Sequence, residues 1–437
     1  MNPDKPSTSF EGKPSQRTHS NIDLEVEGDK KNQLHHDVPI QDKKTNEQQT
    51  TNILDFPDEV LLCILKNVDI SDLKNLRLCC TRLSRLAEDK FLWKLDYRKK
   101  PILVSQMLPY DTFLEPLTHT LAIRGDFDQD WKNLLSCFFF SEIKQICQVL
   151  NTLIIEDFYI SVEEIMPSLA TTIEELQIIN CRSYHNVQDF QPVRFVRGIC
   201  YFVPYIKRLT FKKVLCDLEG SLVTYISNLT ELEELSFISC FRIKEFRRNI
   251  DVSSQYKCQK LKILDFRNTA VEDRLVEWFC HIKSLEELYL ECPKFLRKEW
   301  SFRLLQELEN IGYRQNISLI QYDEMLQVLL DAERRSDNRV EIIGVRDETF
   351  RHYLLSKISD YIIKCNNLKK LHIRHYWRVT RTNIDRIATT LPNLIELDIT
   401  GCCVTLEDVK HFESQRPNVQ TYSSFSESHD KYKSSSV

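Results

Sequence analysis

The hydrophobic pattern divides the chain into a stretch without a pattern, a short helical stretch and a long repetitive one. Residues 1–50 are rich in Lys, Asp, Gln, Asn, Thr and Ser, and their scattered apolar positions follow neither a helical nor a strand period. Such a segment buries too little apolar surface to offset the entropy lost on ordering. We therefore expect a disordered tail over residues 1–50 and a second one over the serine-rich residues 423–437.

Residues 55–95 have the pattern of short helices. Pro57 suits a first helical turn, and Asp58 and Glu59 place negative charge at the positive end of the helix dipole. Five apolar residues then recur at helical spacing: Val60, Leu61, Ile64, Leu65 and Val68. A second helix and a third apolar cluster, which ends at Leu95, complete the stretch.

This helical stretch has more apolar surface than a module of its size can bury. Three short helices in about 40 residues are near the limit of what one core stabilises. Leu62 and Cys63 lie off the main apolar stripe and widen it. We expect part of this surface to bind another protein. The alternative is an N-terminal helical cap that packs only on its own chain.

The same stretch resembles the F-box, the motif by which substrate receptors bind the Skp-type adaptor of SCF cullin–RING ubiquitin ligases. The family pattern appears as Phe56-Pro57-Asp58-Glu59, Val60 to Val68, Asp72-Leu73, Cys80-Thr81-Arg82 and Leu92-Trp93. Two positions depart from it, because Phe56 replaces the usual Leu and Leu83 stands where many members have Trp. The resemblance implies an F-box over residues 52–98 that binds the adaptor through Phe56, Pro57, Leu62, Leu65, Leu73, Leu76 and their neighbours. The sequence does not sort these six residues into interface and core.

From residue 99 to residue 422 the chain returns to one pattern, apolar-x-x-apolar-x-apolar. Clear copies begin at residues 150, 173, 206, 232, 261, 285, 368 and 394, and weaker copies at 118, 314 and 340. The spacing averages about 28 residues, which is within the range of leucine-rich repeats. Each copy predicts a short strand, and the segments between copies have the helical spacing that a return path needs. The expected fold class is α/β, with a small three-helix F-box followed by a curved solenoid of parallel inner strands and outer helices.

Cysteine positions support this register. Three cysteines occupy the ninth place of a repeat and three stand three residues before the next repeat: Cys181, Cys240 and Cys402, then Cys147, Cys258 and Cys365. These places resemble the cysteine-containing repeat class that is often coupled to F-boxes. We interpret the six as buried structural thiols rather than as metal ligands or nucleophiles. Residues 416–424 look like a terminal half-repeat that faces water.

Polar side chains alternate with the buried ones along the predicted strands, and on an inner sheet they face the concave side. Acidic and basic repeats alternate, which suits a protein partner because complementary charges give selectivity. The residues expected to contact a target are Glu234, Glu287, Tyr289, Lys370, His372, Arg374 and Trp377. The alternative is that each is an ordinary solvated strand residue and that Trp377 fills a corner of its repeat.

Composition and charge narrow the classes of function. A net charge of -5 and a pI near 6.2 give no basic field, so no nucleic-acid partner is expected. No apolar run approaches the roughly 20 residues of a membrane span, so no membrane partner is expected. The 15 cysteines include no CxxC pair, which favours free thiols in a reducing compartment, the cytoplasm or the nucleus. We interpret the adjacent His35, His36 and Asp37 as solvated, and expect no metal or other cofactor.

The sequence contains none of the patterns GxxxxGK, GxGxxG, HExxH or GxSxG, so no catalytic residue is expected. The expected function is that of a non-catalytic substrate receptor in an SCF-type ubiquitin ligase. Its F-box would bind the Skp-type adaptor and, through it, cullin and RING subunits, while the repeats hold the protein to be ubiquitinated. One alternative is a leucine-rich-repeat scaffold outside ubiquitin transfer. Another is a receptor for a small cofactor set inside the repeat arc.

Overall fold

A computed structural model describes most of the repetitive region and all of the helical stretch. It describes residues 52–127, 134–161, 165–183, 192–214, 224–240, 258–271, 273–293, 297 and 358–426. The chain divides into two compact units, residues 1–55 and residues 56–437. In the first unit the described part includes the short 3-10 helix η1 (Ile53–Asp55). The expected tail over residues 1–50, the sequence His35-His36-Asp37 and most of the expected C-terminal tail lie outside the described residues.

The helical stretch forms three helices, α1 (Asp58–Leu65), α2 (Ile70–Leu76) and α3 (Thr81–Ala87). The expected second helix is divided into α2 and α3, and the third apolar cluster, which ends at Leu95, is not helical. Pro57 occupies the N-cap of α1, and the Cys80 sulfur accepts a hydrogen bond from the Leu83 amide at 3.4 Å at the start of α3. The end of the stretch is already sheet, since Leu95 lies in strand β1 (Lys94–Asp96). The hydrophobic pattern did not indicate this strand.

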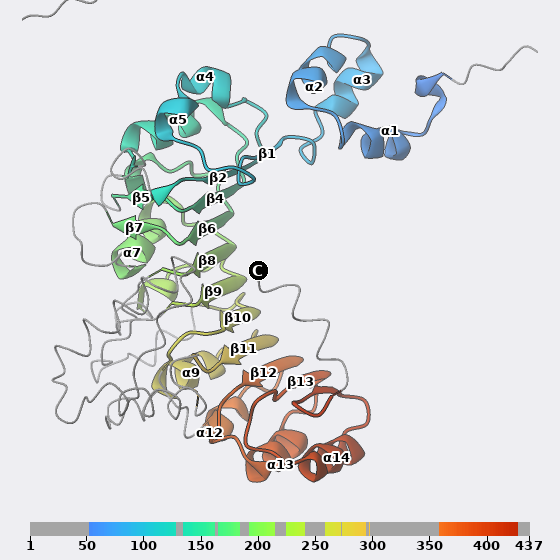
Figure 1. Cartoon of the computed structure of the whole chain (residues 1–437), viewed down its shortest axis with the longest axis vertical. Coiled ribbons are helices and arrows are strands. Elements are labelled where there is room, and N and C mark those ends of the chain that lie inside the picture. The colour runs from blue at the N-terminus through green and yellow to red at the C-terminus, as the bar shows by residue number, and fades with distance from the viewer. Residues whose placement is uncertain are drawn as a thin grey trace, which may run out of the picture. The chain divides into compact units, whose positions relative to one another are not determined.

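Parallel strands form one long sheet in the described part of the chain, in the order β1-β2-β4-β6-β8-β9-β10-β11-β12-β13-β14 (Figure 1). The strands after β1 are β2 (Thr120–Arg124), β4 (Thr152–Glu156), β6 (Glu175–Ile179), β8 (Arg208–Lys212), β9 (Glu234–Ile238), β10 (Ile263–Phe266), β11 (Glu287–Glu291), β12 (Lys370–Arg374), β13 (Glu396–Asp398) and β14 (Gln420–Tyr422). All eight clear copies of the repeat are therefore strands, and so is the weaker copy at 118. The expected terminal half-repeat supplies β14, which pairs with β13 at the end of the sheet.

The repeats expected at residues 314 and 340 lie outside the described residues. Strand β11 pairs directly with β12 along its whole length, from Glu287 opposite Lys370 to Glu291 opposite Arg374. Because a strand has only two pairing edges and β11 also pairs with β10, no further strand lies between β11 and β12. The repeats expected at residues 314 and 340 therefore stay a prediction.

Helices return the chain between strands, and Figure 1 shows them along one side of the long sheet. They are α4 (Tyr110–Phe113), α5 (Cys137–Ile146), α7 (Pro192–Phe202), α9 (Asp273–Cys280), α12 (Ile358–Ile362), α13 (Arg381–Thr390) and α14 (Leu406–Gln415), with 3-10 helices η2 (Val104–Met107) and η4 (Met166–Ser168). A second sheet of three short parallel strands consists of β3 (Leu134–Leu135), β5 (Tyr159–Ile160) and β7 (Arg182–Ser183). Helix α13 is an example of how the sequence sets these helices. Thr380 and Asn383 form a capping box at its start, and Ile384, Ile387 and Ala388 are buried along one side.

Each repeat buries its first, fourth and sixth residues, and these stack from one repeat to the next. At the sixth place Phe211, Phe237 and Phe266 form a column with ring centroids 5.1 and 5.9 Å apart and nearly parallel rings. The eighth place takes a left-handed backbone in repeat after repeat: Asp157, Asn180, Lys213, Ser239, Asn268, His375 and Gly401. Only short polar residues and glycine adopt this conformation at low cost, which fits most of these residues but not lysine.

The ninth place joins neighbouring repeats. The Cys240 thiol donates to the carbonyl of Phe211 at 3.5 Å, and the Cys402 thiol donates to that of Ile373 at 2.8 Å, in each case on the preceding strand. The hydroxyl of Thr269 replaces the thiol and donates to Phe237 at 2.5 Å. Burial raises the pKa of Cys181, another cysteine at this place, to about 12, so it stays a protonated donor. The interpretation of these cysteines as structural thiols is confirmed.

Candidate protein-interaction surfaces

Helix α1 packs one side into the core of the helical module. The buried cluster of this module consists of Leu61, Leu65, Leu73, Leu86, Leu92 and Trp93. The Trp93 indole nitrogen donates to the backbone oxygen of Ala87 at 2.8 Å, which ties the end of α3 to the cluster. Leu62 and Leu76 are half-buried and pack against this cluster from its edge.

The side of α1 next to the buried one is apolar and exposed. Phe56, Val60 and Ile64 recur every four residues and retain 39%, 41% and 38% of their accessible surface. We call these three residues the outer row of α1. The sequence pattern grouped Val60 and Ile64 with Leu61 and Leu65 in one apolar face. The structure divides that face, because successive residues of a helix turn by about 100° and the small core receives only the side with Leu61 and Leu65.

The six residues expected at the adaptor interface thus fall into different environments. Phe56 and Pro57 are exposed, whereas Leu65 and Leu73 are buried in the module core. Leu65 and Leu73 belong to the buried cluster that holds α1 and α2 together, and the adaptor contact of all six residues stays a prediction. No sequence signal separated the two groups, because both consist of apolar residues at helical spacing.

An ion-pair cluster fixes the start of α1 on α3. The Arg82 guanidinium donates to the Asp58 carboxylate at 2.6 Å and to the backbone oxygen of Phe56 at 2.7 Å, and Arg85 donates to the other Asp58 oxygen at 2.5 Å. The hydrogen bond from Arg82, aided by the charge of both arginines, lowers the pKa of Asp58. The contact to the Phe56 carbonyl holds the first residue of the outer row in place.

The second candidate surface is the face of the long sheet that carries the third, fifth and seventh residues of each repeat. We call it the strand face. The register confirms the alternation expected from the sequence, because equivalent residues of successive repeats are direct partners across the strands, as are Tyr289 of β11 and His372 of β12. Polar and charged side chains fill most of these places from β9 to β13.

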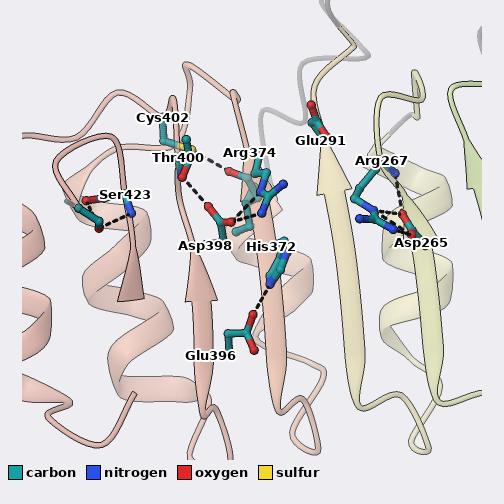
Figure 2. A network of polar contacts seen from close by, with 12 residues as sticks. Asp265, Arg267, Glu291, His372, Arg374, Glu396, Asp398, Thr400, Cys402 and Ser423 are labelled. Atoms are coloured by element: carbon teal, nitrogen blue, oxygen red, sulfur yellow. Dashed lines mark hydrogen bonds and ion pairs between the residues drawn. The ribbon is translucent and has the colours of Figure 1, made fainter. Parts of the chain in front are cut away.

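Ion pairs link neighbouring strands across this face (Figure 2). The Lys370 ammonium lies 2.9 Å from the Glu287 carboxylate, which joins β12 to β11. The Arg374 guanidinium lies 2.5 Å from the Asp398 carboxylate, which joins β12 to β13. Arg267 instead pairs with Asp265 of its own repeat at 2.6 Å. Partly buried pairs of this kind limit each side chain to one position and so give the face a defined pattern of charge.

His372 lies at the centre of this network and is only 6% exposed. Its Nε2 lies 2.8 Å from a carboxylate oxygen of Glu396, and an ionised carboxylate only accepts, so Nε2 carries the proton. Burial lowers the pKa of His372, although the hydrogen bond to Glu396 opposes the shift. The imidazole is therefore neutral at pH 7, and its Nδ1 is an acceptor without a hydrogen-bond partner among the described residues.

Tyr289 contacts both His372 and Glu287. Its hydroxyl donates to Glu287 at 2.6 Å, and its ring meets the His372 ring edge to face with centroids 4.6 Å apart. The Arg267 guanidinium lies 5.6 Å from the centroid of the same ring. Burial, followed by the hydrogen bond to Glu287, raises the pKa of Tyr289, so its hydroxyl remains a donor.

The structure thus brings together five of the seven residues expected to contact a target: Glu287, Tyr289, Lys370, His372 and Arg374. Glu234 lies on the same face on β9 but outside these ion pairs. Trp377 follows β12 and is 39% exposed, with the Arg378 guanidinium 5.1 Å from its ring centroid. Its cation–π partner Arg378 is not one of the residues of the ion-pair network.

The described residues contain neither a metal-binding cluster nor a membrane-spanning helix. No group of three or more His, Cys, Asp or Glu side chains there is arranged to hold a metal ion. Within the same residues no helix combines the length and hydrophobicity that crossing a bilayer requires.

Comparison with known proteins agrees with the helical module. A family model described as F-box domain matches residues 53–95. No curated protein matches the chain. Among solved structures, an internalin from Listeria monocytogenes is 15% identical, with 84% of this chain and 94% of that chain covered and a TM-score of 0.33. A leucine-rich-repeat protein from Leptospira interrogans is 11% identical, with 79% and 86% covered and a TM-score of 0.29.

At these scores neither solved structure adds to the fold, which rests on the strand register and the repeat. Two observations on this chain remain: the family match over α1, α2 and α3, and a ladder of parallel strands that repeats the leucine-rich pattern. The chain therefore contains an F-box domain at residues 53–95, followed by parallel strands that repeat the leucine-rich pattern.

Proposed function

We propose that the chain is the substrate-recognition subunit of an SCF-type ubiquitin ligase. The observation that supports this most directly is the outer row of α1, which lies inside the F-box match and consists of exposed large apolar side chains. Exposed apolar rows of this kind lose water-accessible area when a partner protein covers them, and this area is the main source of binding energy. A Skp-type adaptor is the partner that an F-box implies.

The strand face is the proposed receptor for the target protein. Its ordered ion pairs present fixed charges, which suit recognition of a protein surface rather than chemistry on a small molecule. In this proposal the chain itself catalyses nothing. Cullin and RING subunits, recruited through the adaptor, bring the ubiquitin-loaded enzyme close to the bound target, and the gain in rate comes from local concentration. The proposed place of action is the cytoplasm or the nucleus.

The test is co-purification of the full chain with a Skp-type adaptor and cullin. The intact chain should retain both proteins, and a chain lacking residues 52–98 should retain neither. Loss of both proteins from the intact, folded chain would contradict the proposal. Retention of the adaptor without cullin would favour the alternative, a leucine-rich-repeat scaffold outside ubiquitin transfer.

Proximity labelling in cells separates the roles of the two surfaces. The intact chain should label adaptor, cullin and target proteins. Without residues 52–92, a deletion that keeps β1 in the sheet, the ligase subunits should disappear, while targets held by the strand face should persist. Loss of the targets together with the ligase subunits would show that the strand face alone does not hold them.

A further inference from the structure

Charges alternate along one row of the strand face, the row formed by the third residue of each repeat. Direct partners across the strands run from Glu175 through Arg208 to Glu234, and from Glu287 through Lys370 to Glu396. Anionic and cationic residues thus take turns on both sides of β10. On β10 itself the row has Ile263, which is the partner of both Glu234 and Glu287. The alternation is interrupted where a cation would stand.

The interruption leaves Glu234 without an ion pair among the described residues. Arg208, its neighbour on one side, donates to Glu175 at 2.7 and 3.0 Å. The ammonium of Lys262, next to Ile263 in sequence, lies 3.5 Å from Glu233 instead. The Ser236 hydroxyl, 3.5 Å away, is the hydrogen-bond partner that Glu234 has. Burial raises the pKa of Glu234, the nearby Arg208 opposes this, and the negative charges of Glu175 and Asp265 add to it.

The geometry of the interruption fits one basic side chain. Neighbouring strands are about 4.8 Å apart, so the Cα atoms of Glu234 and Glu287 are about 9–10 Å apart with Ile263 between them. A guanidinium group placed above Ile263 is within reach of both carboxylates. The methylene groups of an arginine can cover the half-buried Ile263 while its charged end remains between the acids.

A second observation on the same face indicates the same kind of ligand. His372 is more than nine-tenths buried, and its Nδ1 lacks a hydrogen-bond partner among the described residues. Since Nε2 donates to Glu396, Nδ1 only accepts, and the group that satisfies it must be a donor. Nδ1 itself is closed to solvent, so a donor from a basic segment lying across β9 to β12 reaches it only if the side chains around His372 move apart.

The charge of the strand face agrees with this chemistry. From β9 to β13 it has six carboxylates, Glu234, Asp265, Glu287, Glu291, Glu396 and Asp398, against three cations of the strands, Arg267, Lys370 and Arg374. A fourth cation, Arg297 beyond β11, pairs with Glu291 and reduces the excess to two. From β2 to β8 it has Glu156 and Glu175 against Arg124, Arg208 and Lys212. The excess of negative charge thus lies on the half of the face that contains Ile263, and it favours a cationic partner there.

We propose that an arginine of the target protein binds above Ile263, between Glu234 and Glu287, and completes the alternating row. This rests on the proposed function, because it states the chemistry of the target that the strand face receives. Glu234 and Glu287 accept the guanidinium hydrogen bonds, and Ile263 supports the side chain. Other hydrogen-bond donors of the bound segment lie over β12, near His372.

The experiment uses the full chain and a library of nine-residue peptides with a central arginine, each matched to a peptide with the neutral isostere citrulline. Affinities are measured by fluorescence anisotropy for the unchanged chain, Glu234→Gln and Ile263→Arg. The control is Glu413→Gln, at an exposed acid of α14 away from the strand face. Circular dichroism and thermal unfolding establish that each variant is folded.

The expected result is that arginine peptides bind at least about tenfold more tightly than their citrulline partners. Glu234→Gln should weaken that binding by about tenfold, and Ile263→Arg should abolish it because the new guanidinium occupies the place itself. Glu413→Gln should change nothing. The proposal is overturned if no peptide prefers arginine to citrulline, or if a preferred peptide binds Glu234→Gln as tightly as the unchanged chain.

Adaptor binding is measured on the same samples, which separates this inference from the ligase role. Loss of adaptor binding with an intact arginine preference refutes the ligase role alone. Adaptor binding without an arginine preference refutes this inference alone. Because Glu234→Gln leaves the size of the side chain unchanged, it decides the matter even where Ile263→Arg fails to fold.

Discussion

Helix α1 and strand β12 each bury one side in a core, yet the sides that remain outside differ in chemistry. On α1 the outer row of Phe56, Val60 and Ile64 is apolar and exposed. On β12 the exterior residues Lys370, His372 and Arg374 are each held by a carboxylate of a neighbouring strand.

The difference shows how the two surfaces can bind. The outer row loses its contact with water only when another protein covers it. Binding there therefore depends on buried apolar area and is insensitive to salt. Most of the strand face already has its charges paired, so a partner gains little from most of its residues. The one interruption of the charge pattern, at Ile263, is where an added charge gains most.

The largest expected effect tests whether the two sides of α1 are distinct. Leu61→Ala should destabilise the helical module by about 2–5 kcal/mol, because it removes a fully buried side chain and leaves a cavity. Val60→Ala, one residue away and exposed, should cost less than about 1 kcal/mol. Hydrogen exchange of the amides in residues 58–87 measures both. Equal protection in the two variants would show that α1 has no preferred inner side.

The next effect concerns the outer row as a binding surface. Ile64→Glu should weaken binding of a Skp-type adaptor by at least about 100-fold, roughly 2.7 kcal/mol, because a carboxylate would be buried without a partner. Ile64→Leu, which keeps the side chain apolar, is the matched control and should retain most of the affinity. Isothermal titration calorimetry at low and high salt provides the measurement. Unchanged affinity in Ile64→Glu would remove the outer row from the interface.

A smaller effect concerns how the repeats are joined. Thr269→Val keeps the shape of the side chain but removes the hydroxyl that donates to Phe237 and accepts from the Cys240 amide at 3.1 Å. Leaving these buried groups unpaired should cost about 1–3 kcal/mol of unfolding free energy. Thr400→Val, at a half-buried place, is the control. If urea unfolding gives the same midpoint for both variants, the ninth place does not join the repeats energetically.

The smallest expected effect is on the pH dependence of the strand face. Burial lowers the pKa of His372, so as pH falls below about 6.5 the unfolded chain takes up a proton that the folded chain refuses. Stability should therefore fall with falling pH in this range. His372→Gln should reduce that dependence. Melting temperatures between pH 5.5 and 7.5 measure it, and equal slopes for His372→Gln and the unchanged chain would contradict the expectation.

Much of this architecture could be predicted from single residues and their spacing. The pattern of Leu150, Leu153 and Ile155 indicated a strand that recurs, and the structure has a strand at every clear copy. The ninth-place cysteines indicated a register that their hydrogen bonds confirm. Strand β1 was not predicted, because three residues next to a helical segment have too few alternations to show a strand period.

The sites were less predictable, for a physical reason. Glu287, Lys370 and His372 are far apart in sequence or on separate strands, and their pairing depends on β11 lying directly beside β12. The expected repeats at 314 and 340 would have separated them. Because a pairing between strands is a long-range contact, no local pattern contains it.

The sequence by itself determined the periods: helices from Pro57 onward, repeated strands from residue 118 onward, and cysteines at fixed places. Periods are local properties, set by how many residues make one turn of a helix or one step of a strand. Only the tertiary structure decided that Leu61 faces inward while Ile64 faces outward, and that Ile263 falls between Glu234 and Glu287. Those facts depend on which distant residues become neighbours, and that is settled by packing of the whole chain.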